Sequence, residues 1–377
     1  MIRFLGIFVC ILLFPYGYLF AQEVHQDLKE IITADITKIV REEDRVIEGT
    51  DTSTHVQNVE AMLTSGSLEG KTVLFDNEIV VLEVGDTVYL HYLKTINGDE
   101  YFIFKDFKRH TQLVAVSVFF VVLLVFFARL QGVRALLSLG ASIGAILFVL
   151  VPLLLNGYNP IFVSLGVATL ILAFALFVTH GITAQSTIAF FGTVSAVCIT
   201  ALVAWVSVSS MRLTGFGHDA SVSLNFATNG TLDFGGLLLG SIIIGILGML
   251  DDVSITQVSV VQQLKKANST LEAKELYKRA IVVGKDHLGS LVNTLALAYV
   301  GVSLPLVLLL AHTDAAVGLS LNQEVVASEL VRIIVGSIGL ILAVPITTLI
   351  AAWYFGNRAV TDDEGKDVSS LRVGHSH

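Results

Sequence analysis

Seven apolar segments, each close to the length of a membrane-crossing helix, dominate the sequence after residue 110. A helix rises about 1.5 Å per residue and the hydrocarbon core of a bilayer is about 30 Å thick, so one crossing needs about 20 apolar residues. The segments are residues 111–130, 135–155, 160–179, 185–206, 235–256, 288–311 and 330–355. They predict a polytopic α-helical membrane protein, with a bundle of about seven transmembrane helices over residues 111–356.

The composition agrees with this class. Of the 377 residues, 54% are hydrophobic and only 15% are charged, which is too apolar for an ordinary soluble domain. The net charge of −9 argues against nucleic-acid binding, which needs a concentrated basic surface. The two cysteines, Cys10 and Cys198, lie far apart in apolar segments, so the sequence offers neither a disulfide framework nor a CxxC motif.

The first 21 residues form a separate apolar segment. They hold a single basic residue, Arg3, and the apolar run ends before the polar pair Gln22 and Glu23. A basic start followed by an apolar run and a polar boundary is typical of a signal peptide. Residues 1–21 are therefore predicted to be a signal peptide or an uncleaved N-terminal anchor that exports the following domain.

Residues 22–110 have the period of a β structure. Ile32, Ala34 and Ile36 alternate with polar residues, which is the pattern of a half-buried strand. Asn97-Gly98 is typical of a type I′ hairpin turn. Further short strands are predicted at 71–75, 79–82, 87–92 and 100–104. The segment is predicted to fold as an extracytoplasmic small all-β domain, either a barrel or a sandwich.

The basic residues predict the orientation of the helices, because cytoplasmic loops are enriched in lysine and arginine. Six basic residues crowd the stretch 265–285 after the fifth segment, and three lie in the polar tail 357–377. The alternate loops carry only Arg212 and Arg332. The tail and the 265–285 loop are therefore expected to be cytoplasmic, and the β domain is expected outside.

Two adjacent carboxylates, Asp251 and Asp252, lie within the fifth apolar segment, near its C-terminal end. A charge within a membrane helix costs at least about 2.5 kcal/mol, so such groups usually face a cavity or a partner helix. On helical spacing, Asp252 belongs to a stripe of small and polar residues. The stripe consists of Ser241, Gly245, Gly248, Asp252, Thr256, Ser259 and Gln263. It is expected to press against a neighbouring helix and to aim Asp252 into the bundle.

The start of the sixth segment carries a second set of polar residues, at a depth that matches the two carboxylates. Together they make the predicted intramembrane polar site, formed by Asp251, Asp252, Asp286, His287, Ser290 and Asn293. Clustered carboxylates can share a proton, a divalent cation or a cationic substrate. The alternative is that the acids reach the cytoplasmic interface and pair with Lys265, Lys285 or the arginines near residues 129–134. The sequence names no metal.

Glycines recur at positions where two helices could approach closely. Gly140 with Gly144 and Gly236 with Gly240 have the GxxxG spacing. The predicted helix-packing set is Gly140, Gly144, Gly236, Gly240, Gly245 and Gly248. Packing within the bundle is the first interpretation. A homo- or hetero-oligomeric contact, through these helices or through the outer domain, is the alternative.

Three late motifs resemble those of one family. The motifs are Gly248-Met249-Leu250-Asp251-Asp252, Gly284-Lys285-Asp286-His287-Leu288-Gly289 with Asn293-Thr294-Leu295, and Gly336-Ser337-Ile338-Gly339 with Val344-Pro345-Ile346-Thr347. The outer domain adds Leu63-Thr64-Ser65-Gly66, Glu69-Gly70-Lys71, Val84-Gly85-Asp86 and residues 101–109 to the resemblance. With these motifs, the chain resembles the YibE/F-like family of bacterial multi-spanning membrane proteins.

The resemblance implies an exported β domain on a bundle of about seven helices in the cytoplasmic membrane of a bacterium. It points to Asp251, Asp286 and Asn293 as motif positions, and it implies no particular activity. The family pattern has a single aspartate followed by small apolar residues, so Asp252 is an additional acid in this sequence.

Two function classes follow from these features. The first is a secondary transporter or permease with a proton or cation site, because acids and glycine-rich helices lie within the membrane segments. The second is a non-transporting receptor or assembly protein whose outer β domain binds a partner. The sequence contains no HExxH, GxSxG or GxxxxGK motif, so neither an enzyme nor a bound cofactor is expected. The expected partners are the lipid bilayer and a proton, cation or small solute.

Overall fold

The computed structural model describes residues 28–46, 53–95, 99–217, 219–312 and 317–357. Their contacts divide them into two compact units, residues 28–126 and residues 127–357, and each is described by itself. The predicted signal peptide at 1–21, the Asn97-Gly98 turn and nearly all of the tail at 357–377 lie outside the described residues.

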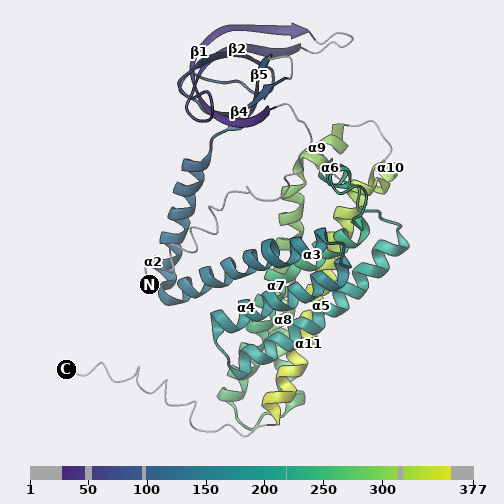
Figure 1. Cartoon of the computed structure of the whole chain (residues 1–377). Helices are drawn as coiled ribbons and strands as arrows, with labels where there is room; N and C mark the ends of the chain where they lie inside the picture. Colours follow the sequence, from purple (N-terminus) through teal and green to yellow (C-terminus); the bar gives the residue numbers. More distant parts are fainter. Residues whose placement is uncertain (1–27, 47–52, 96–98, 218, 313–316, 358–377) are drawn as a thin grey trace, which may run out of the picture. The chain divides into compact units, whose positions relative to one another are not determined.

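The first unit contains a five-stranded antiparallel sheet (Figure 1). Its strands are β1 (Leu28–Val46), β2 (Ser53–Leu63), β3 (Thr72–Asn77), β4 (Thr87–Lys94) and β5 (Glu100–Phe107), arranged in the order β3-β2-β1-β4-β5. The register of β1 against β2 shifts between Ile36 and Lys38 and again between Ile39 and Arg41. Such bulges bend and twist a strand, so the sheet curls into a half-barrel and its edge strands β3 and β5 come into contact.

The period-two pattern predicted for β1 is confirmed. Ile32, Ala34 and Ile36 are at most 2% exposed and lie in one apolar core inside the curled sheet. The other strands contribute alternate residues to the same core, including Val59, Leu63, Phe75, Leu90 and Phe104. The predicted all-β domain is therefore a half-barrel with its own core.

Two strand predictions differ from the structure. Residues 79–82 are not a strand, and β2 has no counterpart in the sequence prediction. The buried side chain of Gln57 explains the first difference, because its Oε1 accepts from the Leu82 N–H at 2.7 Å and its Nε2 donates to the Leu82 carbonyl at 3.1 Å. These bonds occupy the backbone groups of Leu82 that a sheet partner would need.

The helical elements are α2 (His110–Ala145), η1 (Ile146–Leu150), α3 (Val151–Leu155), α4 (Pro160–His180), α5 (Ala184–Ser210), α6 (Asp219–Ala227), α7 (Phe234–Ala267), α8 (Ala273–Val302), α9 (Leu304–His312), α10 (Val317–Asn322) and α11 (Glu324–Gly356). Among the described residues, five helical runs are long and apolar enough to cross a membrane, and α8 with α9 makes a sixth if that bent pair counts as one.

The difference from the seven predicted spans arises in the first run. The expected spans 111–130 and 135–155 form one run of 46 residues, His110–Leu155. The run is interrupted at Arg129, whose φ of 49° and ψ of −127° are not helical. At 1.5 Å per residue, 46 residues extend about 69 Å, roughly twice the thickness that one crossing needs. A total of seven helices stays a prediction.

Two further boundaries correct the sequence analysis. The basic stretch 265–285 is not a loop, because α7 continues to Ala267 and α8 begins at Ala273. The sixth span, predicted at 288–311, is bent by 68° between α8 and α9. Pro305 lies at this break and has no N–H to continue the α8 hydrogen bonds.

Helix α7 is central in the second unit and contacts α4, α5, α8 and α11 (Figure 1). Antiparallel α5 and α11 meet through two reciprocal glycine–threonine pairs. A Cβ on Gly192 would lie 2.6 Å from Thr347 Oγ1, and a Cβ on Gly339 would lie 2.5 Å from Thr200 Oγ1. Each helix therefore has a glycine where the other has a threonine, and this lets the backbones approach closely.

We expect Leu90→Ala to destabilise an isolated domain of residues 28–109 by about 2–5 kcal/mol, because it opens a cavity in the core. Ile31→Ala is the matched control on an adjacent strand, since Ile31 is 52% exposed and its loss opens no cavity. Urea unfolding followed by circular dichroism measures both. Equal destabilisation by the two substitutions would contradict the half-barrel core.

In the helical unit, we expect Gly192→Ala to lower the melting temperature of the detergent-solubilised protein, at a cost of about 1–3 kcal/mol from overpacking against Thr347. Gly166→Ala on α4 is the control, because no atom lies within 4 Å of the added Cβ. Alanine has the higher helix propensity, so the control is expected to be neutral or stabilising. Equal melting temperatures for the two variants would show that α5 and α11 are not this close.

Candidate functional site

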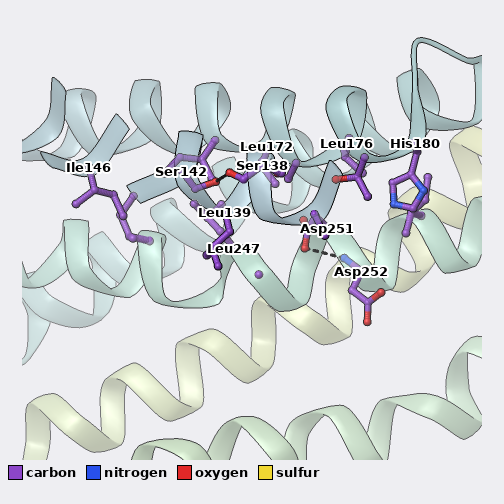
Figure 2. Close-up of a pocket in the computed structure, with 17 residues that line it drawn as sticks. Ser138, Leu139, Ser142, Ile146, Leu172, Leu176, His180, Leu247, Asp251 and Asp252 are labelled. Atoms are coloured by element: carbon purple, nitrogen blue, oxygen red, sulfur yellow. Dashed lines mark hydrogen bonds between the residues drawn. The ribbon is translucent and has the colours of Figure 1, made fainter. Parts of the chain in front are cut away.

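A cavity of about 500 Å³, whose lining is mostly apolar with a few polar side chains, lies between α2, α4 and α7. We call it the Asp251 cavity, because Asp251 and Asp252 of α7 form one wall (Figure 2). Ser138 and Ser142 of α2 and Thr179 and His180 of α4 supply its other polar groups. The rest of the lining is apolar and includes Leu139, Ile146, Leu172, Leu176 and Leu247.

The two acids occupy consecutive positions on α7, but the Asp251 side chain lies on the cavity side of the helix, whereas the Asp252 carboxyl points away from α2 and α4 (Figure 2). Asp251 is half-buried and Asp252 is exposed. The Asp251 Oδ1 accepts a hydrogen bond from the backbone N–H of Asp252 at 2.8 Å. His180, the last residue of α4, lies close enough to Asp252 for the two side chains to interact electrostatically. Ser142 donates to the Ser138 carbonyl at 2.9 Å, and its oxygen keeps free lone pairs as an acceptor.

The structure corrects the role expected for the α7 stripe. Ser241, Gly245, Gly248, Asp252 and Thr256 are all exposed, so the stripe does not press along its length against a neighbouring helix. The line of exposed residues Ser241, Gly245, Gly248, Asp252 and Thr256, which we call the seam of α7, has the Asp251 cavity on one side and α8 on the other. A Cβ on Gly248 would meet no atom within 4 Å, which leaves the seam open beside Asp252.

The six predicted polar residues do not share one cavity. Asp286 and His287 line a second cavity of about 310 Å³ between α7, α8 and α11, together with Thr256 and Gln257. We call this the Gln257 cavity. Ser290 and Asn293 are exposed on α8 and line neither of the two cavities. Asp251 and the Gln257 cavity lie on different sides of α7, because residues 251 and 257 differ by about 120° around the helix. Asp286 of α8 therefore lies on the other side of α7 from Asp251.

The alternative, in which the acids form ion pairs at the cytoplasmic interface, is not seen in the described residues. There, Asp251, Asp252 and Asp286 form no salt bridge. Lys265, one of the suggested partners, is 7% exposed and donates instead to the Leu271 carbonyl at 2.9 Å. In the part of the chain that the structure describes, no three His, Cys, Asp or Glu side chains are grouped closely enough to hold a metal ion.

The glycines of the packing set have different surroundings. Gly236 and Gly240 of α7 lie against Pro160 and Ser164 of the parallel helix α4. Gly245 lies beneath the hydroxyl of Tyr299 from α8. Gly140 is buried, whereas a Cβ on Gly144 would be 3.9 Å from Phe148 of the same helical run and one on Gly248 would meet open space.

A second charged group was missed because Arg332 is predicted to lie in one of the alternate loops. In α11, the Arg332 Nη1 donates to Glu329 Oε1 at 2.6 Å, with side-chain exposures of 18% and 10%. The Nη2 donates to Ser241 of α7 at 3.1 Å, and the guanidinium lies 5.8 Å from the Tyr299 ring centroid. Within the described residues, the buried Arg332 Nε has no acceptor. The i, i+3 spacing of Glu329 and Arg332 is the sequence signal that marks this pair.

His180, Ser138 and Ser142 were also missed. They come from helices more than seventy residues away from Asp251 along the chain, and each alone is an ordinary polar residue of an apolar segment. Only the packing of α2 and α4 around α7 brings them to the carboxylates. No local sequence signal identifies them.

Comparison with known proteins gives one match. The model of the YibE/F-like protein family matches residues 116–357, a range that contains α4 to α11 and both cavities and leaves out the β half-barrel. No curated protein and no solved structure matches the chain. Long apolar helices and the family match both indicate an integral membrane protein. Since the match covers more than half of the sequence, the chain belongs to the YibE/F-like family.

Proposed function

We propose that the protein is a secondary transporter or permease that moves a proton or a monovalent cation through the Asp251 cavity. The observation that carries the proposal is the half-buried Asp251 carboxylate, which lines a cavity among apolar helices without a salt bridge in the described residues and has the exposed Asp252 beside it on α7. A carboxylate in such surroundings is costly unless it is protonated or accompanied by a cation. Binding a mobile positive charge would remove this cost.

The surrounding groups suit a small cation better than a tightly held divalent ion. Calcium takes about 6–8 oxygen ligands, and its sites are built from several fixed carboxylates. The Asp251 cavity offers the Asp251 carboxylate, three hydroxyls and the His180 imidazole around about 500 Å³ of open space. This loose, hydratable set favours reversible occupation, which a transport site requires.

The seam on α7 suggests a route to the site. Gly248 leaves space directly beside Asp252, and Gly245 and Ser241 continue the same line toward the start of α7. Tyr299 and Arg332 cover that line at Gly245 and Ser241. The proposed pathway is therefore open beside the carboxylates and closed by side chains nearer the N-terminal end of α7.

In proteoliposomes loaded with a pH-sensitive dye, we expect Asp251→Asn and Asp252→Asn each to reduce cation-driven proton flux about tenfold or more. The amide keeps the size and hydrogen bonding of the side chain and removes the charge. The assay compares sodium, potassium and an imposed pH gradient alone, so it also names the coupling ion.

Glu275→Gln is the matched control, because Glu275 is an exposed carboxylate at the start of α8 that pairs with Arg279 at 2.9 Å. Its flux is expected to equal that of the unaltered protein. Unchanged flux in both aspartate variants, with all proteins reconstituted to the same level, would rule out the Asp251 cavity as the transport site.

The receptor or assembly function is the second candidate, and one observation favours it. On the outward side of the half-barrel, Ile31, His91 and Ile103 are paired across β1, β4 and β5, and Ile31 and Ile103 are 52% and 47% exposed. Tyr101 lies nearby on β5 and is 53% exposed. An apolar patch on a sheet face suits protein contact. If transport is the function, the Ile103→Asp protein is expected to keep full flux in proteoliposomes. If the outer domain acts by binding a partner, the same substitution is expected to abolish the activity of the protein in the cell.

A further inference from the structure

The Gln257 cavity contains a buried amide whose nitrogen has no hydrogen-bond partner in the described residues. Gln257 of α7 is 3% exposed, and its Oε1 accepts a hydrogen bond from the Thr348 hydroxyl of α11 at 3.0 Å. The Nε2 lies beside Gly284 of α8, at a place where a Cβ on that glycine would collide with it. The missing side chain of Gly284 therefore leaves room for an NH2 group, which has two protons to donate.

The amide nitrogen of Gln257 is open to the cavity. Among the described residues, Arg332 Nε is the only side-chain nitrogen or oxygen that is both sealed inside the protein and without a hydrogen-bond partner. The Gln257 Nε2 also has no partner there, so it is not sealed, and the space that Gln257 and Gly284 both line is this cavity. A donor in a largely buried side chain is costly to leave unused, so the cavity has a place for a hydrogen-bond acceptor.

The other polar groups of the lining are the Asp286 carboxylate, the His287 imidazole and the Thr256 hydroxyl. Asp286 forms no salt bridge within the described residues, and neither lysine nor arginine is among the residues that line the cavity there. The rest of the wall is aliphatic and consists mainly of Val253, Val283, Leu291 and Val344. The cavity thus combines a neutral donor, an anionic acceptor and an apolar surface.

This combination disfavours simple ions as ligands. A carboxylate could accept from Gln257, but it would share an apolar cavity with the charge of Asp286 and no lysine or arginine among the described residues. An alkylammonium ion could pair with Asp286, but it has no acceptor for the Gln257 NH2 group. A neutral carboxamide has a carbonyl oxygen and N–H donors on one planar group, so it can serve both side chains.

We propose that the Gln257 cavity binds a small aliphatic primary carboxamide. The carbonyl oxygen of the ligand accepts from Gln257 Nε2, its NH2 group donates to the Asp286 carboxylate, and its alkyl chain packs on the valine and leucine wall. A cavity of about 310 Å³ accommodates a chain of a few carbons. Within the GKDHLG motif at 284–289, Gly284 then makes room for the Gln257 amide and Asp286 accepts from the ligand.

The test is equilibrium dialysis of radiolabelled butyramide against the full-length protein in nonionic detergent, with detergent alone as the blank for partition into micelles. We expect saturable binding that unlabelled butyramide displaces. Three analogues are expected not to displace it at the same concentration. Butyrate is negatively charged and has no N–H, n-butylammonium has no acceptor, and N,N-dimethylbutyramide has no N–H donor.

Two substitutions test the two polar contacts. Gln257→Glu keeps an oxygen that can accept from Thr348 and removes the NH2 group, so it is expected to weaken butyramide binding about tenfold or more. Asp286→Ala is expected to weaken binding by about the same factor, because it removes the charged acceptor. Asp286 is exposed, so this variant is expected to keep the fold. Asp251→Asn is the control, because Asp251 lines the other cavity and its loss should leave butyramide affinity unchanged.

The proposal is overturned if butyramide does not bind saturably, if butyrate or n-butylammonium displaces it as well as butyramide does, or if Asp286→Ala binds as tightly as the unaltered protein. The inference goes beyond the proposed transport of a proton or monovalent cation. Dialysis needs no flux, so either result can fail while the other stands.

Discussion

The bundle depends on close contact between helices at positions where one of them lacks a side chain. Lipid tails are as apolar as leucine, so the hydrophobic effect does not drive membrane helices together, and packing of small residues must do so. The pairs Gly192 with Thr347 and Gly339 with Thr200 join α5 to α11 in this way. Gly236 and Gly240 join α7 to α4 by the same means.

This packing decides where polar groups lie. With α4 and α5 on some sides of α7 and α8 and α11 on others, the buried faces of α7 are apolar and include Ile242, Ile246, Leu250 and Val258. Ser254, Gln257 and Lys265 are the buried polar residues of α7, and the first two contact Thr347 and Thr348 of α11. The carboxylates lie outside this core, in cavities where water or an ion can reach them. A charge sealed in the core would cost more than the helix contacts return.

The two cavities differ in volume and in the polar groups that line them. The Asp251 cavity is large and carries the Asp251 carboxylate with hydroxyls, which suits a hydrated ion that passes through. The Gln257 cavity is smaller and combines one acid and one amide with an aliphatic wall. They flank the same seam of α7, since Asp252 and Thr256 are one helical turn apart. An ion in one cavity would therefore change the electrostatic field at the other.

The sequence by itself determined the elements that depend on local pattern. Runs of about 20 apolar residues identify membrane helices, period-two alternation identifies β1, and the late motifs identify the family. It could not determine that residues 79–82 form a loop, because a distant buried side chain, Gln57, takes the hydrogen bonds of Leu82. It also could not place Asp286 apart from Asp251. Helical spacing gives the angle of a residue on its own helix, whereas only the packing of α8 and α4 around α7 decides which cavity that angle faces.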